Sequence, residues 1–141
     1  WATDQNSGSY VSFDTTKLNT QRGTGTTMIA TANTFTGGTT ITAGTLNVTN
    51  VSGLGTSGTL SINGASTTRL STDTAFGGAN PVYNMLMFGG GSYTGTIELN
   101  RATAGASSAI THNFGLLTIS LNGGGAATLN VTAGCSVRIA E

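Results

Sequence analysis

The acidic side chains and the histidine are the residues whose types could do chemistry, and they are spread thinly along the chain. The five acids are Asp4, Asp14, Asp73, Glu98 and Glu141. Polysaccharide-cleaving sites need paired acids or a carboxylate cluster that holds calcium, whereas these acids come one to a region. His112 is the only histidine, and no Gly-x-Ser-x-Gly turn is present to expose a nucleophilic serine beside it. The sequence therefore predicts a protein that is not an enzyme and has no catalytic residue.

The sequence offers equally little for a metal or a cofactor. One histidine and one cysteine are too few for a zinc site, and we interpret Cys135 as a small buried residue. We interpret Glu98 as a solvated strand residue and Asp73 as a turn residue. The glycine clusters lack the Lys-Ser/Thr of a phosphate-binding loop and are not followed by a helix; they lie at 37–38, 77–78, 89–91 and 123–125. We therefore expect no cofactor and no metal.

Composition limits the partners that the chain can have. Only 7% of the 141 residues are charged, and five basic side chains balance five acidic ones. A neutral, charge-poor surface lacks the positive field that nucleic acid or anionic membrane requires, so we expect neither as a partner. No apolar run approaches the roughly eighteen residues of a membrane span, and we expect no membrane insertion by this segment. The 22 glycines and single proline, with apolar residues recurring in alternation, indicate one all-β domain of many short strands.

Residues 33–48 show the pattern around which the chain is built. Two short alternating runs, Thr40-Ile41-Thr42 and Leu46-Asn47-Val48, are joined by Ala43-Gly44. Alternation puts the apolar side chains on one face of a half-buried strand, and a small residue followed by glycine allows a corner. Two strands with this corner and the glycine pair at 37–38 make about one coil of a solenoid.

Residues 33–48 also resemble a known family, the autotransporter-associated β-strand repeat, which is also called the passenger-associated transport repeat. The family's pattern is an Asn, an aromatic residue, Thr-Gly, Thr-x-Ile, a small residue with Gly, and Leu-x-Val. This chain has Asn33, Phe35, Thr36-Gly37, Thr39 to Ile41, Ala43-Gly44 and Leu46 to Val48 at those places. The resemblance implies a right-handed parallel β-helix in a secreted bacterial protein that is extracellular or displayed on the cell surface.

Later parts of the chain repeat pieces of this stretch. The sequence of Thr45–Thr49 returns letter for letter at Thr128–Thr132. We therefore predict a β-helix repeat domain over residues 33–141. Its inward ladder is predicted to contain Ile41, Leu46, Val48, Leu60, Ile62, Ile97, Leu99, Leu117, Ile119, Leu121, Leu129, Val131, Val137 and Ile139. Replacing a buried leucine such as Leu129 by alanine is expected to cost about 2–5 kcal/mol. The alternative is an antiparallel β-sandwich, which a two-residue hairpin turn at Asn63-Gly64 would favour.

The two ends of the chain suggest how the protein acts. Residues 1–32 have few regular strands, and we interpret them as an N-terminal cap or connecting arm. An arm with the hydrophobic residues Tyr10, Val11 and Phe13 could add a strand to a neighbouring sheet edge. At the other end, Val137 and Ile139 lie in a strand that no cap follows. We expect this structural element to join end to end, with copies of itself or with further repeats, in an extracellular fibre or stalk.

The alternative function is an adhesin, or a module that binds surface carbohydrate or ice through an outward row of threonines. Thr40-x-Thr42 could begin such a row. A flat receptor face needs Thr-x-Thr at the same place on each coil, and later strands carry Ser61, Glu98 and Asn130 there. This departure disfavours the ice-binding hypothesis.

Overall fold

The structure, a computed structural model, describes residues 2–4, 9–12, 19–103, 110–133 and 136–140. Within these ranges the chain forms strands and no helix. The strands are β1 (Ala2–Asp4), β2 (Ser9–Ser12), β3 (Asn19–Arg22), β4 (Thr26–Ile29), β5 (Thr39–Ile41), β6 (Gly44–Val48), β7 (Thr59–Ile62), β8 (Ser66–Ser71), β9 (Asn84–Gly90), β10 (Tyr93–Asn100), β11 (Thr111–Asn122), β12 (Ala127–Ala133) and β13 (Ser136–Ala140).

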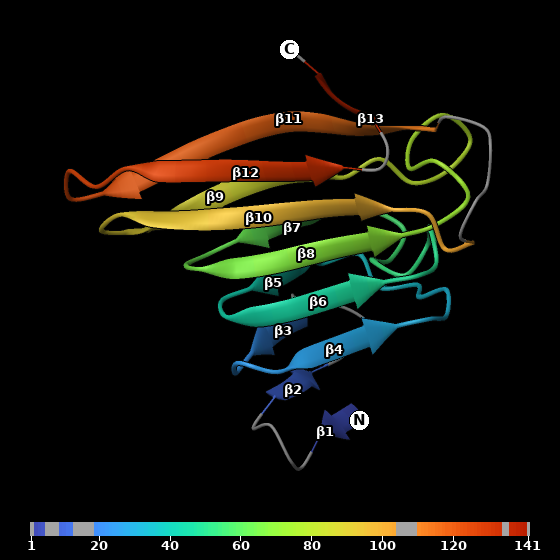
Figure 1. Cartoon of the computed structure of the whole chain (residues 1–141), viewed down its shortest axis with the longest axis horizontal. Coiled ribbons are helices and arrows are strands. Elements are labelled where there is room, and N and C mark those ends of the chain that lie inside the picture. The colour runs from blue at the N-terminus through green and yellow to red at the C-terminus, as the bar shows by residue number, and fades with distance from the viewer. Residues whose placement is uncertain (1, 5–8, 13–18, 104–109, 134–135, 141) are drawn as a thin grey trace.

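From β3 onward the strands alternate between two sheets (Figure 1). The back sheet has the order β1-β2-β3-β5-β7-β9-β11-β13, and the front sheet has the order β12-β10-β8-β6-β4. All pairings among β3 to β13 are parallel, because the chain crosses to the other sheet after each strand. In Figure 1 the front strands run from left to right, and the chain returns behind them as it climbs toward the C-terminal end. The predicted right-handed parallel β-helix is therefore confirmed.

The alternative β-sandwich does not form. Asn63-Gly64 joins β7 of the back sheet to β8 of the front sheet, so this pair makes a corner between sheets and not a hairpin turn. Among the described strands, antiparallel pairing occurs between β1 and β2 and between β2 and β3. The antiparallel part is thus confined to the N-terminal segment.

The corner at Ala43-Gly44 requires glycine for two physical reasons. Gly44 has a φ of 71°, a backbone conformation that side chains with a Cβ disfavour. A Cβ built at Gly44 would also lie 2.4 Å from the Gly23 carbonyl oxygen and 2.5 Å from that of Gly25. The coil below therefore leaves no room for a side chain at this corner.

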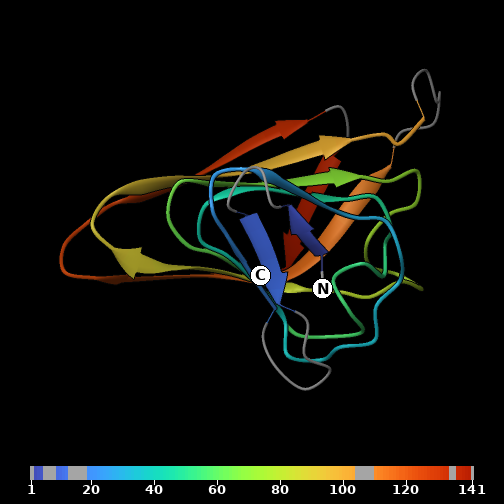
Figure 2. The same cartoon turned by 90° about the horizontal axis from the view of Figure 1, so that it is seen from below.

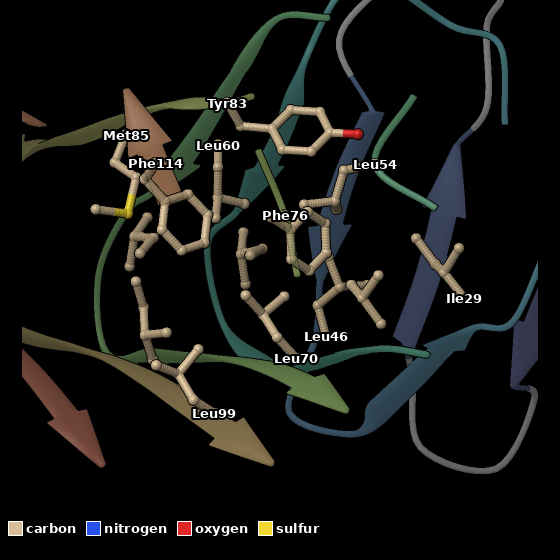
Figure 3. Packing of buried hydrophobic residues seen from close by; sticks show 14 residues of the cluster. Ile29, Leu46, Leu54, Leu60, Leu70, Phe76, Tyr83, Met85, Leu99 and Phe114 are labelled. Atoms are coloured by element: carbon tan, nitrogen blue, oxygen red, sulfur yellow. The ribbon is translucent and has the colours of Figure 1, made fainter. Parts of the chain in front are cut away.

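The core lies between the two sheets and consists of inward columns, to which each coil contributes one residue. One column of the back sheet contains Ile41, Ile62, Met87 and Ile119. One column of the front sheet contains Ile29, Val48, Leu70 and Leu99. Corner loops close one side of this core with Leu54, Phe76 and Tyr83, which point inward among the strand residues (Figure 3).

The prediction of buried inward residues is correct for the middle coils. It is wrong for the last coil, whose described inward residues are only half-buried or are exposed. The fully buried members are Ile41, Leu46, Val48, Leu60, Ile62, Ile97 and Leu99. The members that are only half-buried are Leu117, Leu121, Leu129 and Ile139. Ile119 is 51% exposed and Val131 is 40% exposed, because the part of the chain that the structure describes places no complete coil above them. The side chain of Val137 lies outside the described part.

Candidate assembly site

At the C-terminal end of the described coil, two strand edges beside Ile119 and Val131 have no partner strand, in addition to the outer edge of β13. β12 pairs with β10 on one side only, so within the described structure its other edge is open. β13 pairs with β11 over Thr111 to Leu116, which leaves the part of β11 from Leu117 to Asn122 paired with β9 alone. Open parallel edges of this kind can accept another strand.

Apolar side chains lie between these two edges. Ile119 of β11 and Val131 of β12 belong to inward columns, directly above Met87 and Ile97 respectively. Met87 and Ile97 are almost fully buried, whereas Ile119 and Val131 are exposed. The end of the core is therefore an apolar surface that is flanked on both sides by strand edges.

The structure places the predicted assembly residues of the C-terminal end in β13. Val137 pairs with His112, and Ile139 pairs with Phe114. The side chain of Ile139 is half-buried and packs against the core cluster. β13 is thus the first strand of one further coil, parallel to β11, with a shift in register between Phe114 and Leu116. It covers one half of β11 and leaves the half that contains Ile119.

The N-terminal end has a different construction. Tyr10 and Val11 lie in β2, which pairs with β1 on one side and with β3 on the other. β2 also contacts β4 of the front sheet, and Figure 2 shows the N-terminal strands lying across the lower end of the coil. A strand added here would meet the edge of β1, because both edges of β2 are occupied. Phe13 lies outside the described residues, and the role of this arm in assembly stays a prediction.

The first coil begins with β3 and β4. β3 pairs in parallel with β5, and β4 pairs in parallel with β6. Both strands lie within residues 1–32, and the interpretation of that segment as a cap or connecting arm stays a prediction. Within the described residues, the cap-like antiparallel pairing involves β1, β2 and β3, as far as Arg22.

The polar residues that the sequence singles out hold strands and corners together. Glu98 does not stand alone on its strand, because it forms an ion pair with Arg69 of the neighbouring β8. Both side chains are on the outward face and remain partly exposed. An exposed pair of this type contributes about 0–1 kcal/mol. Glu98 is therefore an outward, partly solvated strand residue, as interpreted from the sequence, and the structure adds Arg69 as its cross-strand partner.

Asp73 connects two corners that are far apart in the sequence. Its Oδ1 accepts hydrogen bonds from Arg101 Nε at 2.9 Å and from the Thr103 N–H at 3.2 Å. Its Oδ2 accepts a hydrogen bond from the Thr103 hydroxyl at 2.6 Å. The Thr103 hydroxyl first, and then Arg101, lower the pKa of Asp73 to about 2. This carboxylate is committed to structural bonds on neighbouring coils.

His112 is a core residue. It is fully buried in β11, and its Nδ1 accepts a hydrogen bond from the Phe76 N–H at 3.2 Å. Burial, and then the charge of Arg101, lower the pKa of its imidazole. A substrate in solvent would not reach this ring. In the described ranges, no group of three or more His, Cys, Asp or Glu side chains could hold a metal ion.

One comparison with known proteins gives a match. Residues 20–48 match the family model of the passenger-associated-transport-repeat. This segment is therefore similar to a passenger-associated-transport-repeat. The matched segment runs from β3 to β6, and its two halves stack in parallel register, with Thr20 beside Thr40 and Thr26 beside Thr45. No curated protein and no solved structure matches the chain.

The passenger-associated-transport-repeat is a structural repeat of autotransporter passengers, which associates the chain with secreted or cell-surface proteins. Among the residues that the structure describes, no helix is long and apolar enough to cross a membrane. The residues that sequence reasoning missed are Ile119 and Val131, which form the apolar part of the open end. Their alternation identified the correct face, but only the position of the last complete coil shows that this face is uncovered.

Proposed function

We propose that the chain is a non-enzymatic structural element of a bacterial extracellular or cell-surface fibre or stalk. Its C-terminal end accepts another β-helical coil. The passenger-associated-transport-repeat and the parallel coil support the structural role. The observation that carries the assembly is the apolar end surface of Ile119 and Val131 between two open strand edges. An added coil would bury both side chains and pair both edges at once.

The two ends of the described coil differ, and this difference sets the expected size of an assembly. The N-terminal strands lie across the lower end of the coil (Figure 2). In the described structure the outermost strands at that end are β4 and the antiparallel β1, so the lower end does not present the pair of parallel strands that the C-terminal end presents. A second copy that joins through its own C-terminal end gives a dimer. A longer filament requires β1 and β2 to move away from β4. Further repeats of the same type can instead continue the coil above β12 and β13.

Sedimentation velocity over a wide concentration range tests self-assembly. We expect the sedimentation coefficient of the 141-residue chain to rise with concentration. The double variant Ile119→Lys/Val131→Lys places two charges on the apolar end and is expected to stay monomeric. Phe88→Lys is the control, because Phe88 is an apolar residue of the back sheet, which also contains Ile119; Phe88 is 42% exposed and lies below the open end. A wild-type chain that stays monomeric at the highest concentration would contradict joining between copies.

The continuation by further repeats needs its own measurement. A second segment of residues 33–141 is fused after residue 141, and the urea midpoint of the fusion is compared with that of the single chain. An added coil on the open end is expected to raise the midpoint, because nearest-neighbour interfaces stabilise solenoid coils. The same fusion with Ile119→Lys/Val131→Lys in its first copy is expected to lose this gain.

A second candidate function is binding of surface carbohydrate through a hydroxyl row on the front sheet. The register places Thr26, Thr45, Thr67 and Thr96 side by side on the outward face. The sequence analysis compared Thr40 with Ser61, Glu98 and Asn130 as if they formed one row. Thr40 and Ser61 belong to the back sheet, whereas Glu98 and Asn130 belong to the front sheet. The neighbouring outward row contains Met28, Asn47, Arg69 and Glu98, and its charges disfavour a flat ice-binding face.

A glycan array with the wild-type chain and Thr67→Lys tests this second candidate. Thr67 lies in the middle of the row, so a lysine there is expected to abolish any binding that uses adjacent hydroxyls. Ser120→Lys on the outer face of the back sheet is the control. Binding that survives Thr67→Lys would contradict a role for the threonine row.

A further inference from the structure

The loop between β8 and β9 enters the core at two points. Phe76 and Tyr83 both come from this loop and are 0% and 1% exposed. The Phe76 ring packs edge-on against Tyr83, with centroids 5.8 Å apart, and stacks on Phe114 of β11 at 6.0 Å (Figure 3). The loop therefore supplies part of the hydrophobic core and is not a surface excursion.

The backbone N–H and carbonyl oxygen of Phe76 each form one hydrogen bond, to two adjacent residues of β11. The Phe76 N–H donates to Nδ1 of His112 at 3.2 Å, and the Phe76 carbonyl oxygen accepts from the Asn113 N–H at 3.0 Å. The His112 ring also packs against the Phe76 ring, with centroids 5.4 Å apart. His112 thus contacts Phe76 through its nitrogen and through its face.

The hydrogen bond from Phe76 determines the protonation state that His112 must have. Nδ1 accepts a hydrogen bond only when it carries no proton, so the imidazole is neutral and its proton is on Nε2. Nε2 is buried and has no hydrogen-bond partner in the structure. A second proton would have to be placed on Nδ1, where the Phe76 N–H already points.

We propose that His112 is an acid-sensitive latch, in which the neutral imidazole holds Phe76 and the adjoining part of the loop before Tyr83 in the core, and protonation releases them. Protonation converts Nδ1 into a donor that faces the Phe76 N–H, so that the hydrogen bond is lost. It also places a positive charge among aromatic rings, and a buried charge without a counter-ion is unfavourable. Solvation of the charged ring requires Phe76 to leave.

The other titratable and charged groups near His112 do not relieve this charge. Arg101 is positive, and the Asp73 carboxylate that pairs with it also binds Thr103. Tyr83 stays neutral, because burial raises the pKa of its hydroxyl to about 12. Tyr83 also bonds to other corners, since its hydroxyl donates to the Gly55 carbonyl oxygen at 2.5 Å and its carbonyl oxygen accepts from the Gly115 N–H. These bonds confine the release to the part of the loop before Tyr83.

The pH window follows from proton linkage. Burial lowers the pKa of His112 in the closed loop, whereas the imidazole of the released loop has an ordinary pKa of about 6.5. The released form therefore binds more protons than the closed form as the pH falls below this value. The ratio of released to closed loop rises by up to about tenfold per pH unit until the pKa of the closed form is reached.

Amide hydrogen exchange at Phe76 tests the latch in the full chain. The protection factor, which corrects for the pH dependence of intrinsic exchange, is measured from neutral pH down to mildly acid pH. We expect the protection of Phe76 to fall by up to about tenfold per pH unit below pH 6.5, while the amides of Leu46 and Leu70 stay protected. Constant protection at Phe76 throughout this range would overturn the proposal.

Two variants separate the latch from general acid destabilisation. In His112→Asn the side-chain oxygen can accept the Phe76 N–H but does not titrate, so protection is expected at neutral pH without the acid-dependent fall. Asp73→Asn removes the neighbouring titratable group and is expected to keep that fall. An equal fall in His112→Asn would overturn the proposal. If His112→Asn does not fold, the NMR resonances of the wild-type His112 imidazole are followed as the pH is lowered. The latch requires these resonances to titrate over the same pH range in which Phe76 loses protection, and titration in a different range would overturn the proposal.

Discussion

Ile119 lies directly above Met87 in the same inward column, yet Met87 is fully buried and half of the Ile119 side chain is exposed. The two residues have the same place in successive coils and differ in whether a coil lies above them. Burial in this fold therefore depends on the position along the coil axis as well as on the face of the strand. This dependence gives different expected costs for similar substitutions.

We expect Met87→Ala to lower the free energy of unfolding by about 2–5 kcal/mol, as is usual for a buried large side chain. Ile119→Ala is expected to cost less than half as much, since part of its side chain already contacts water. Leu129→Ala is expected to lower the free energy of unfolding by a similar small amount, because Leu129 is half-buried. This expected loss is smaller than the loss of about 2–5 kcal/mol that the sequence predicts. Urea denaturation of the three variants checks this order. A cost for Ile119→Ala equal to that of Met87→Ala would show that the end is covered.

Thr68 occupies an inward column between Leu46 and Ile97, and its buried hydroxyl has no hydrogen-bond partner. Thr68→Val keeps the shape and removes the unsatisfied oxygen, so the variant is expected to be more stable by about 1 kcal/mol. Ser66→Ala on the same strand is the control, because the Ser66 hydroxyl donates to the Ile41 carbonyl oxygen at 3.4 Å. The control is expected to give no gain. Thermal unfolding of both variants measures the difference.

Gly44→Ala combines a disfavoured φ with a steric clash against the backbone of the coil below. Gly78 has a similar φ of 66°, but a Cβ there would meet nothing within 4 Å. Gly78→Ala therefore isolates the backbone strain, which costs about 1–2 kcal/mol. Gly44→Ala is expected to cost clearly more, as measured by urea denaturation. Equal losses would mean that the coils can separate at this corner without a penalty.

The low pKa of Asp73 predicts a loss of stability in acid. Its carboxyl has a pKa of about 2 in the folded chain, against 3.8 for the ordinary group. A lowered folded pKa means that the stabilisation is present above pH 3.8 and disappears as the pH falls toward 2. The melting temperature of Asp73→Asn is expected to depend less on pH in that interval than that of the wild type. A parallel fall in both proteins would assign the acid loss to other groups.

The parallel coil could be predicted from residues 33–48, because the alternation and the Ala43-Gly44 corner both depend on local geometry. Register between distant strands could not be predicted in this way. Thr128–Val131 repeats the letters of Thr45–Val48, but Val131 stacks in the column of Leu46 and not in that of Val48. A shift of two residues keeps every side chain on its face, so the alternation contains no information about it.

The partners of polar residues were not predictable for the same reason. Arg69 and Glu98 are 29 positions apart, and only the register of β8 and β10 makes them neighbours. The burial of His112 depends on Phe76, which arrives from an irregular loop whose path has no periodic signal.

Parallel stacking also gives the front sheet an order in which its strands separate. β12 and β4 are each bonded to one neighbour in this sheet, whereas β10, β8 and β6 are each bonded on both sides. β4 is also in contact with β2, and no described strand covers β12 in this way. Because each coil of a solenoid is held only by the coils next to it, the outermost strand can detach without disturbing the next. On heating, β12 is therefore expected to separate from the sheet first, followed by β10 and then β8.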